Sequence, residues 1–128
     1  MSYYFSKVII ATFDEAIMKA TEALKSEGFG VLTEIKIHEK FKEKLGVDFQ
    51  KYTILGACNP AFAYKALQAE NKIGTMLPCN VIVQDIGSGK IEIAAVNPIE
   101  SMQAIKNPSL GETAMKVKEM LERVVMKV

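Results

Sequence analysis

The stretch Leu55-Gly56-Ala57-Cys58-Asn59-Pro60 has the pattern of a strand that ends directly at the start of a helix. The apolar run over residues 52–57 favours a buried strand, for which we predict a central position in a sheet. Asn59 is a good helix N-cap and proline suits the first helical position, so a helix is predicted from Pro60 to about residue 70. A second segment, Leu77-Pro78-Cys79-Asn80, repeats the Cys-Asn pair beside a proline.

The other elements follow from periodicity and from turn residues. Alternating or β-branched runs predict further strands over residues 3–11, 29–37, 79–86 and 90–96, and Gly87-Ser88-Gly89 predicts a hairpin between the last two. The strand over 29–37 is expected to be half-buried, with Phe29, Val31, Ile35 and Ile37 on one side. Helical spacing predicts helices over residues 12–27, 38–45 and 109–128, the first and last opened by capping boxes at Thr12–Glu15 and Ser109–Glu112.

This order of elements, with one obvious hairpin and irregular connections, predicts an α+β fold. We expect a two-layer sandwich in which a mainly antiparallel sheet is packed by helices. The 128 residues are enough for one domain, residues 1–128, and the 49% hydrophobic content predicts a packed core. Segments 38–51 and 97–108 are interpreted as connectors within that domain.

Charge and hydropathy exclude several classes of partner. Sixteen basic and fifteen acidic residues are interspersed and leave a formal charge of +1, so nucleic acid is not expected as a partner. No apolar run approaches the ~20 residues of a membrane span, and the first residues lack the pattern of a secretory leader. We therefore expect no membrane association and a cytoplasmic location.

The two cysteines are the strongest candidates for a functional site. Cys58 directly precedes a predicted helix, where backbone N–H groups favour a thiolate, and Cys79 begins a strand. Because each is followed by an asparagine, we predict a polar ligand site formed by Cys58, Asn59, Cys79 and Asn80. The thiols are expected to be close together, reduced and without a structural metal.

Two other arrangements remain open at the level of sequence. The only histidine, His38, forms a cysteine–histidine catalytic pair if the fold brings it to Cys58. A zinc site requires Cys58, Cys79, His38 and a carboxylate such as Glu34 to meet in space, because neither cysteine belongs to a Cys-x-x-Cys pair. No dinucleotide or phosphate-loop motif is present, and no cofactor is expected.

Several blocks in order make the chain resemble the domain of unknown function 302 family. They are Gly28-Phe29-Gly30-Val31-Leu32, Lys44-Leu45-Gly46-Val47-Asp48-Phe49, Leu55-Gly56-Ala57-Cys58-Asn59-Pro60 and Leu77-Pro78-Cys79-Asn80. The resemblance spans nearly the whole chain and implies a small α+β domain of TATA-binding-protein-like topology, often a homodimer. It supplies no established activity, and that topology does not imply DNA binding.

Two hypotheses for function follow. The first is a homodimeric cytoplasmic module that binds a small molecule or has a structural role, with its site at the two Cys-Asn motifs. Dimerisation is expected because few helices are available to cover the edges and faces of the sheet. The second is a thiol- or metal-dependent enzyme that uses Cys58 with help from His38 or Cys79.

Overall fold

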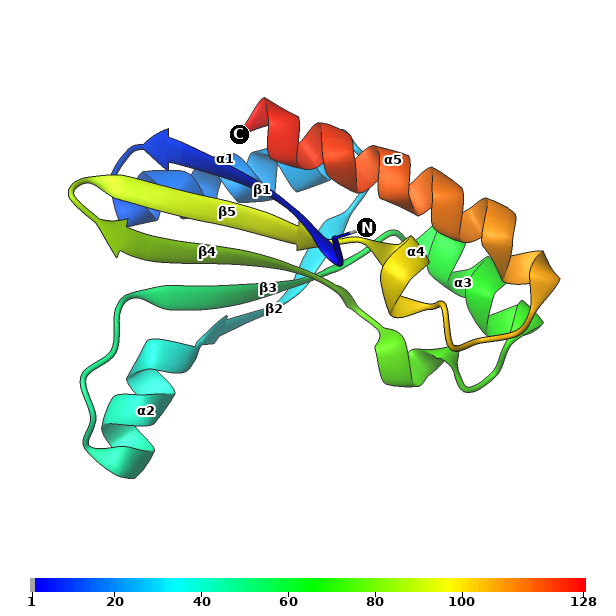
Figure 1. Cartoon of the computed structure of the whole chain (residues 1–128), viewed down its shortest axis with the longest axis horizontal. Helices are drawn as coiled ribbons and strands as arrows, with labels where there is room; N and C mark the ends of the chain where they lie inside the picture. Colours follow the sequence, from blue (N-terminus) through cyan, green and yellow to red (C-terminus); the bar gives the residue numbers. More distant parts are fainter. Residues whose placement is uncertain (1) are drawn as a thin grey trace.

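A five-stranded, fully antiparallel sheet forms the centre of the protein (Figure 1). The computed structural model describes residues 2–128. The strand order is β1-β5-β4-β3-β2, so β4 is the central strand and β3 lies between it and the edge strand β2. The strands are β1 (Tyr4–Ile10), β2 (Gly30–Lys36), β3 (Tyr52–Cys58), β4 (Cys79–Gly87) and β5 (Lys90–Val96). The predicted α+β fold is confirmed.

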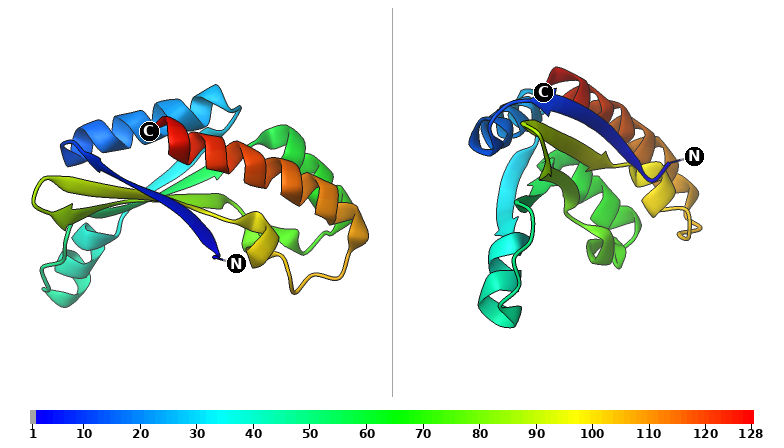
Figure 2. Two further views of the ribbon diagram at one scale, coloured as in Figure 1. Left: turned by 45° about the horizontal axis from the view of Figure 1, so that its top comes forward. Right: turned by 60° about the vertical axis from the view of Figure 1, so that its left-hand side comes forward.

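Two long helices cover one face of the sheet, side by side in all views (Figures 1 and 2). Helix α1 (Phe13–Ser26) begins as predicted, because Thr12 accepts a hydrogen bond from the backbone of Glu15. Helix α5 (Gly111–Lys127) packs its apolar stripe beside it. At their ends Glu27 pairs with Arg123 and Lys127, and the Lys127 hydrogen bond, with that of Arg123, holds the pKa of Glu27 below its usual value.

The main core lies between this helical layer and the strands. Alternate residues of β3, β4 and β5 point into it, including Leu55, Val81 and Ile93, each no more than 1% exposed. Leu24 of α1 and Leu121 of α5 fill it from the helical side. We call the opposite face of the sheet the open face, because no helix within residues 2–128 packs across it.

The edge strand β2 departs from the prediction. A β-bulge shifts the register between Val31 and Thr33, so that Val31 pairs with Ala57 while Ile35 pairs with Ile54. The bulge places Val31 on the helical side and Ile35 on the open face, and only Val31 is half-buried in β2. The half-buried stripe predicted for residues 29–37 is therefore wrong. The strand β3 is an interior strand, paired with β2 on one side and β4 on the other, although β4 is the middle strand of the five.

After β2 the chain forms a projection that we call the arm, residues 37–49. It contains helix α2 (Ile37–Leu45), which ends at Gly46 in the left-handed conformation, and no residue of α2 is buried. Figure 2 shows α2 extending away from the rest of the molecule. Its attachment is aromatic: Phe41 packs edge-on against Phe49, which in turn packs against Tyr52 of β3.

At the other end of the sheet, α3 (Pro60–Ala69) and several short turns form a second, smaller layer. They are the 3-10 helices η1 (Ile73–Met76) and η2 (Pro108–Leu110) and the short helix α4 (Pro98–Ser101). The capping box predicted at Ser109–Glu112 is wrong: Asn107 caps η2, and α5 begins after Leu110 without a side-chain cap. Within residues 2–128, no helix combines the length and apolarity needed to cross a bilayer.

Candidate functional site

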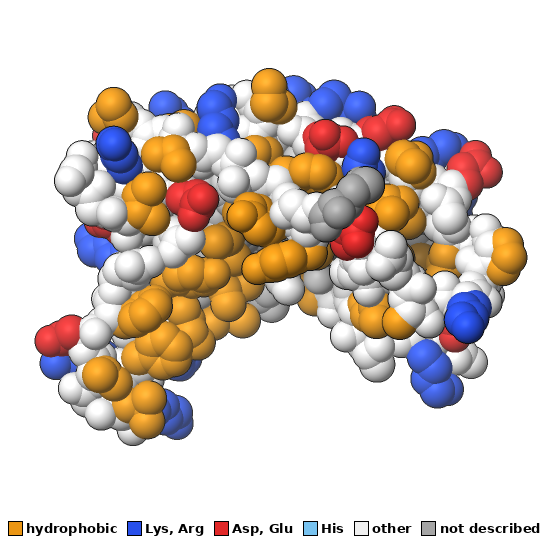
Figure 3. All heavy atoms as spheres, viewed as in Figure 1, with side chains coloured by type: hydrophobic (Ala, Val, Ile, Leu, Met, Phe, Trp, Pro, Cys, Tyr) orange, Lys and Arg blue, Asp and Glu red, His pale blue; other side chains and the backbone are white. Residues whose placement is uncertain are grey.

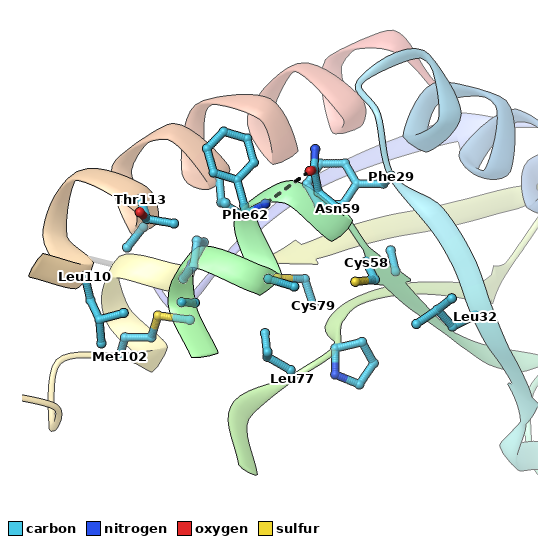
Figure 4. A pocket seen from close by; sticks show the side chains of 17 residues that line it. Phe29, Leu32, Cys58, Asn59, Phe62, Leu77, Cys79, Met102, Leu110 and Thr113 are labelled. Carbon is cyan, nitrogen blue, oxygen red and sulfur yellow. Dashed lines mark hydrogen bonds between the residues drawn. The ribbon is translucent and has the colours of Figure 1, made fainter. Parts of the chain in front are cut away.

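The strand-to-helix junction of the opening motif forms one wall of an apolar cavity of about 270 Å³ (Figure 4). Cys58 is the last residue of β3, and Asn59 accepts a hydrogen bond from the Phe62 N–H at 3.5 Å, as the predicted N-cap of α3. Cys79, the first residue of β4, lies beside Ala57 across the strand pair. Both cysteines line the cavity as free, half-buried thiols.

Gly56 makes this junction possible. A methyl group at this position would lie 2.3 Å from Thr33 Oγ1 and 2.9 Å from Pro78 Cγ, far inside normal contact distance. With no side chain there, the Pro78 ring packs directly against β3. Pro78 itself is part of the cavity wall, so the glycine sets the position of that wall.

The remaining walls come from elements far away in the sequence. Helix α3 contributes Phe62 and Ala66, α5 contributes Ala114 and Val117, and the chain between β5 and α5 contributes Met102. Among all lining side chains, only those of Asn59 and Thr113 carry nitrogen or oxygen. The cavity is therefore suited to hydrocarbon, and not to the polar ligand that the sequence suggested.

Asn80 does not belong to this cavity. It is exposed and pairs with Gly56, and it lines a separate hollow on the open face together with Tyr4 and Tyr52. Successive residues of a strand point to opposite faces, which separates Asn80 from Cys79. Of the four predicted residues, Cys58, Asn59 and Cys79 meet, while Asn80 faces the other side of the sheet.

The electrostatics of the two thiols argue against a ready nucleophile at Cys79. Burial of the Cys79 thiol, and to a lesser extent the charge of the neighbouring Cys58, raises the pKa of Cys79 from 9.0 to about 11. Its thiol is therefore protonated at neutral pH, and a protonated thiol is a poor nucleophile and a poor metal ligand.

His38 does not reach Cys58. It lies beyond the far end of β2, and its Nδ1 atom is 2.9 Å from the backbone nitrogen of Tyr52. Tyr52 and Cys58 are the two ends of β3, which separates them by ~20 Å at about 3.3 Å per residue. The cysteine–histidine pair is thus excluded, and so is the zinc arrangement with His38; no group of three or more His, Cys, Asp or Glu side chains in residues 2–128 is placed to hold a metal.

Sequence reasoning missed most of the cavity. Segment 97–108 was interpreted as a connector, yet Pro98 and Met102 line the site, as does Leu110 from the start of the predicted last helix. The only sequence signal was the presence of large apolar residues in a segment rich in turn formers.

The fold and site thus define a small α+β protein with a one-sided antiparallel sheet and an apolar cavity at the sheet end. The chain matches the family described as Domain of unknown function DUF302 over residues 5–128, and it belongs to that family. It is similar to the crystal structure of an uncharacterized conserved protein DUF302 from Bacillus stearothermophilus. That chain is 30% identical, with a TM-score of 0.91, and the match covers 99% of this chain and 98% of that one. Comparison with curated proteins gave no match.

Proposed function

We propose that the protein binds a small, predominantly apolar molecule in the cavity beside Cys58 and Cys79. The apolar lining carries this proposal, because it offers only two side chains with nitrogen or oxygen to satisfy polar groups of a ligand. A volume of about 270 Å³ suits a short hydrocarbon chain or a single ring system. A ligand with one polar group also fits if that group points to Thr113 or out of the cavity into water.

The test measures binding of N-phenyl-1-naphthylamine, an uncharged dye that fluoresces in apolar surroundings, followed by its displacement with fatty acids of increasing chain length. The informative variant is Ala63→Leu, which adds three carbons to a residue of the cavity wall. Ala61→Leu is the matched control, because Ala61 is exposed on the same helix and outside the cavity.

We expect saturable dye binding to the wild type and to Ala61→Leu, and at least ~10-fold weaker binding to Ala63→Leu, equivalent to about 1.4 kcal/mol. Equal binding by all three proteins would place the dye elsewhere, for example on the open face, and would refute the cavity as the site. Far-ultraviolet circular dichroism establishes that each variant is folded.

We further propose that the protein acts as a homodimer in a reducing, cytoplasmic setting. The support for dimerisation is the uncovered sheet, since a sheet stabilised from one side only leaves apolar surface in water. The support for a reducing setting is that both cysteines are free although they line one cavity. Light scattering of the wild type at micromolar concentration tests the first point, and a monomer mass would contradict it.

A further inference from the structure

The arm carries apolar side chains that the rest of residues 2–128 covers only in part. Leu45 is 71% exposed, and Val47 and Phe49 are each nearly half exposed. Helix α2 has nine residues and none is buried, whereas an isolated helix shorter than about 12–15 residues is marginal in water. The arm therefore has the properties of a segment that is stabilised by a surface outside its own chain.

The open face carries a second apolar surface. Tyr3, Tyr4, Val8, Ile10 and Ile35 are between 41% and 85% exposed, and the centre of the face is a hollow of about 390 Å³. Figure 3 shows hydrophobic side chains continuing from the middle of the sheet onto the arm. The lining of the hollow is mixed: it includes Asn80, Gln84 and Glu92, and Glu92 accepts a hydrogen bond from Gln84.

The size of this surface identifies the class of partner. With about 150–200 Å² for a fully exposed residue of this kind, these eight residues present roughly 700–900 Å² of surface, most of it apolar. The largest patch on a typical monomer is about 300–600 Å², whereas a stable protein–protein interface buries about 800 Å² on each partner. The surface therefore exceeds what a monomer leaves in water and matches what a dimer requires.

We propose that the arm and the open face form a two-fold homodimer interface, in which the arm of each copy lies across the open face of its partner. Each chain carries both a projecting apolar segment and a hollow of mixed polar and apolar lining. In a two-fold dimer each arm meets the partner's hollow, so the same contact forms twice. The lysines of the arm, Lys40, Lys42 and Lys44, are exposed and provide a polar rim. This inference rests on the proposed homodimer and adds the surface that forms it.

Leu45→Asp and Tyr4→Lys test the two halves of the interface. Because symmetry removes each contact twice, we expect either change to raise the dimer dissociation constant by roughly 100-fold or more in sedimentation equilibrium. Met126→Asp is the matched control, since Met126 is 74% exposed on α5, in the helical layer. Circular dichroism and urea unfolding establish that the variants remain folded.

Mixing the two variants tests the crossed arrangement. In a mixed dimer both substitutions fall in the same arm–face pair, the aspartate on the arm of one copy and the lysine on the open face of the other. The second arm–face pair of that dimer is wild type, so dimers should reappear in the mixture only. Two monomeric variants that do not combine would refute arm-to-face contact.

Two further outcomes separate this inference from the proposal on which it rests. A wild type that is monomeric at every concentration would refute the homodimer and this interface together. A wild-type dimer that neither substitution weakens would refute the interface alone and would point to pairing through an edge strand.

Discussion

Replacing Gly56 by alanine tests how closely the strands pack at the cavity. The added methyl group would lie 2.3 Å from Thr33 Oγ1 and 2.9 Å from Pro78 Cγ. The threonine hydroxyl can rotate away, but the proline ring is held by its own backbone, so strain of about 2–3 kcal/mol is expected, in the upper range for overpacked sites. Alanine restricts the unfolded chain more than glycine does, which offsets about 0.5–1 kcal/mol of this strain.

The net expectation for Gly56→Ala is a loss of about 1–2 kcal/mol in the free energy of unfolding, measured by urea denaturation. Gly30→Ala is the matched control, because Gly30 lies in the neighbouring strand β2 and a methyl group there meets no atom of the described residues within 4 Å. The control should be neutral or slightly stabilising.

A double-mutant cycle isolates the contact with Thr33. Thr33→Ala removes the oxygen that lies closest to the new methyl group, so the double variant should recover at least about 0.5 kcal/mol relative to the sum of the single effects. Equal stabilities of Gly56→Ala and Gly30→Ala would show that the junction is loosely packed and that Gly56 does not set the position of the Pro78 wall.

Three more predictions concern single side chains. Since the pKa of Cys79 is about 11 in the folded state and 9.0 ordinarily, the unfolded chain loses this proton first; stability should fall between pH 9 and 11, by up to about 3 kcal/mol, and a Cys79→Ala variant should lose less stability over that range. Asn59→Ala should cost about 0.5 kcal/mol in urea unfolding, the low end for a cap, because its hydrogen bond is 3.5 Å long; Asn59→Asp should be nearly neutral, and a loss above about 2 kcal/mol would imply another role. Thr53→Val should raise the unfolding free energy by about 1 kcal/mol, because Thr53 Oγ1 is buried without a hydrogen-bond partner in the described structure; a decrease in thermal stability would contradict this.

Local signals in the sequence predicted the elements well. The caps at Thr12 and Asn59 are where the sequence placed them, because each depends only on residues within one helical turn. The hairpin at 87–89 is likewise local, with left-handed backbone at all three positions. These features depend on residues that are close together in the sequence, so a sequence pattern is enough to predict them.

Features that depend on three-dimensional pairing were not predictable. The bulge near Leu32 has no glycine or proline to mark it, yet it moves Ile35 from the expected core side to the open face. Asn80 and Cys79 were grouped because they are adjacent in sequence, although a strand separates adjacent side chains. The apolar walls of the cavity come from α3, α5 and the 98–110 segment. These segments come together only through tertiary packing, which a local sequence pattern does not indicate.

The lining of the cavity also limits the affinity and chemistry of its ligand. A polar group buried there without a partner costs about 2–7 kcal/mol, whereas each buried methylene contributes about 0.8 kcal/mol. A chain of six methylenes thus gains roughly 5 kcal/mol from burial, which sets an upper limit on affinity at a dissociation constant of about 0.1–1 mM, because the freedom that the ligand loses on binding weakens it further. A single unsatisfied hydroxyl can cancel this gain. The protonated thiol of Cys79 adds no charge to attract an ionic ligand at neutral pH. Affinity for fatty acids should therefore rise with chain length until the cavity is filled, with the carboxylate remaining in water.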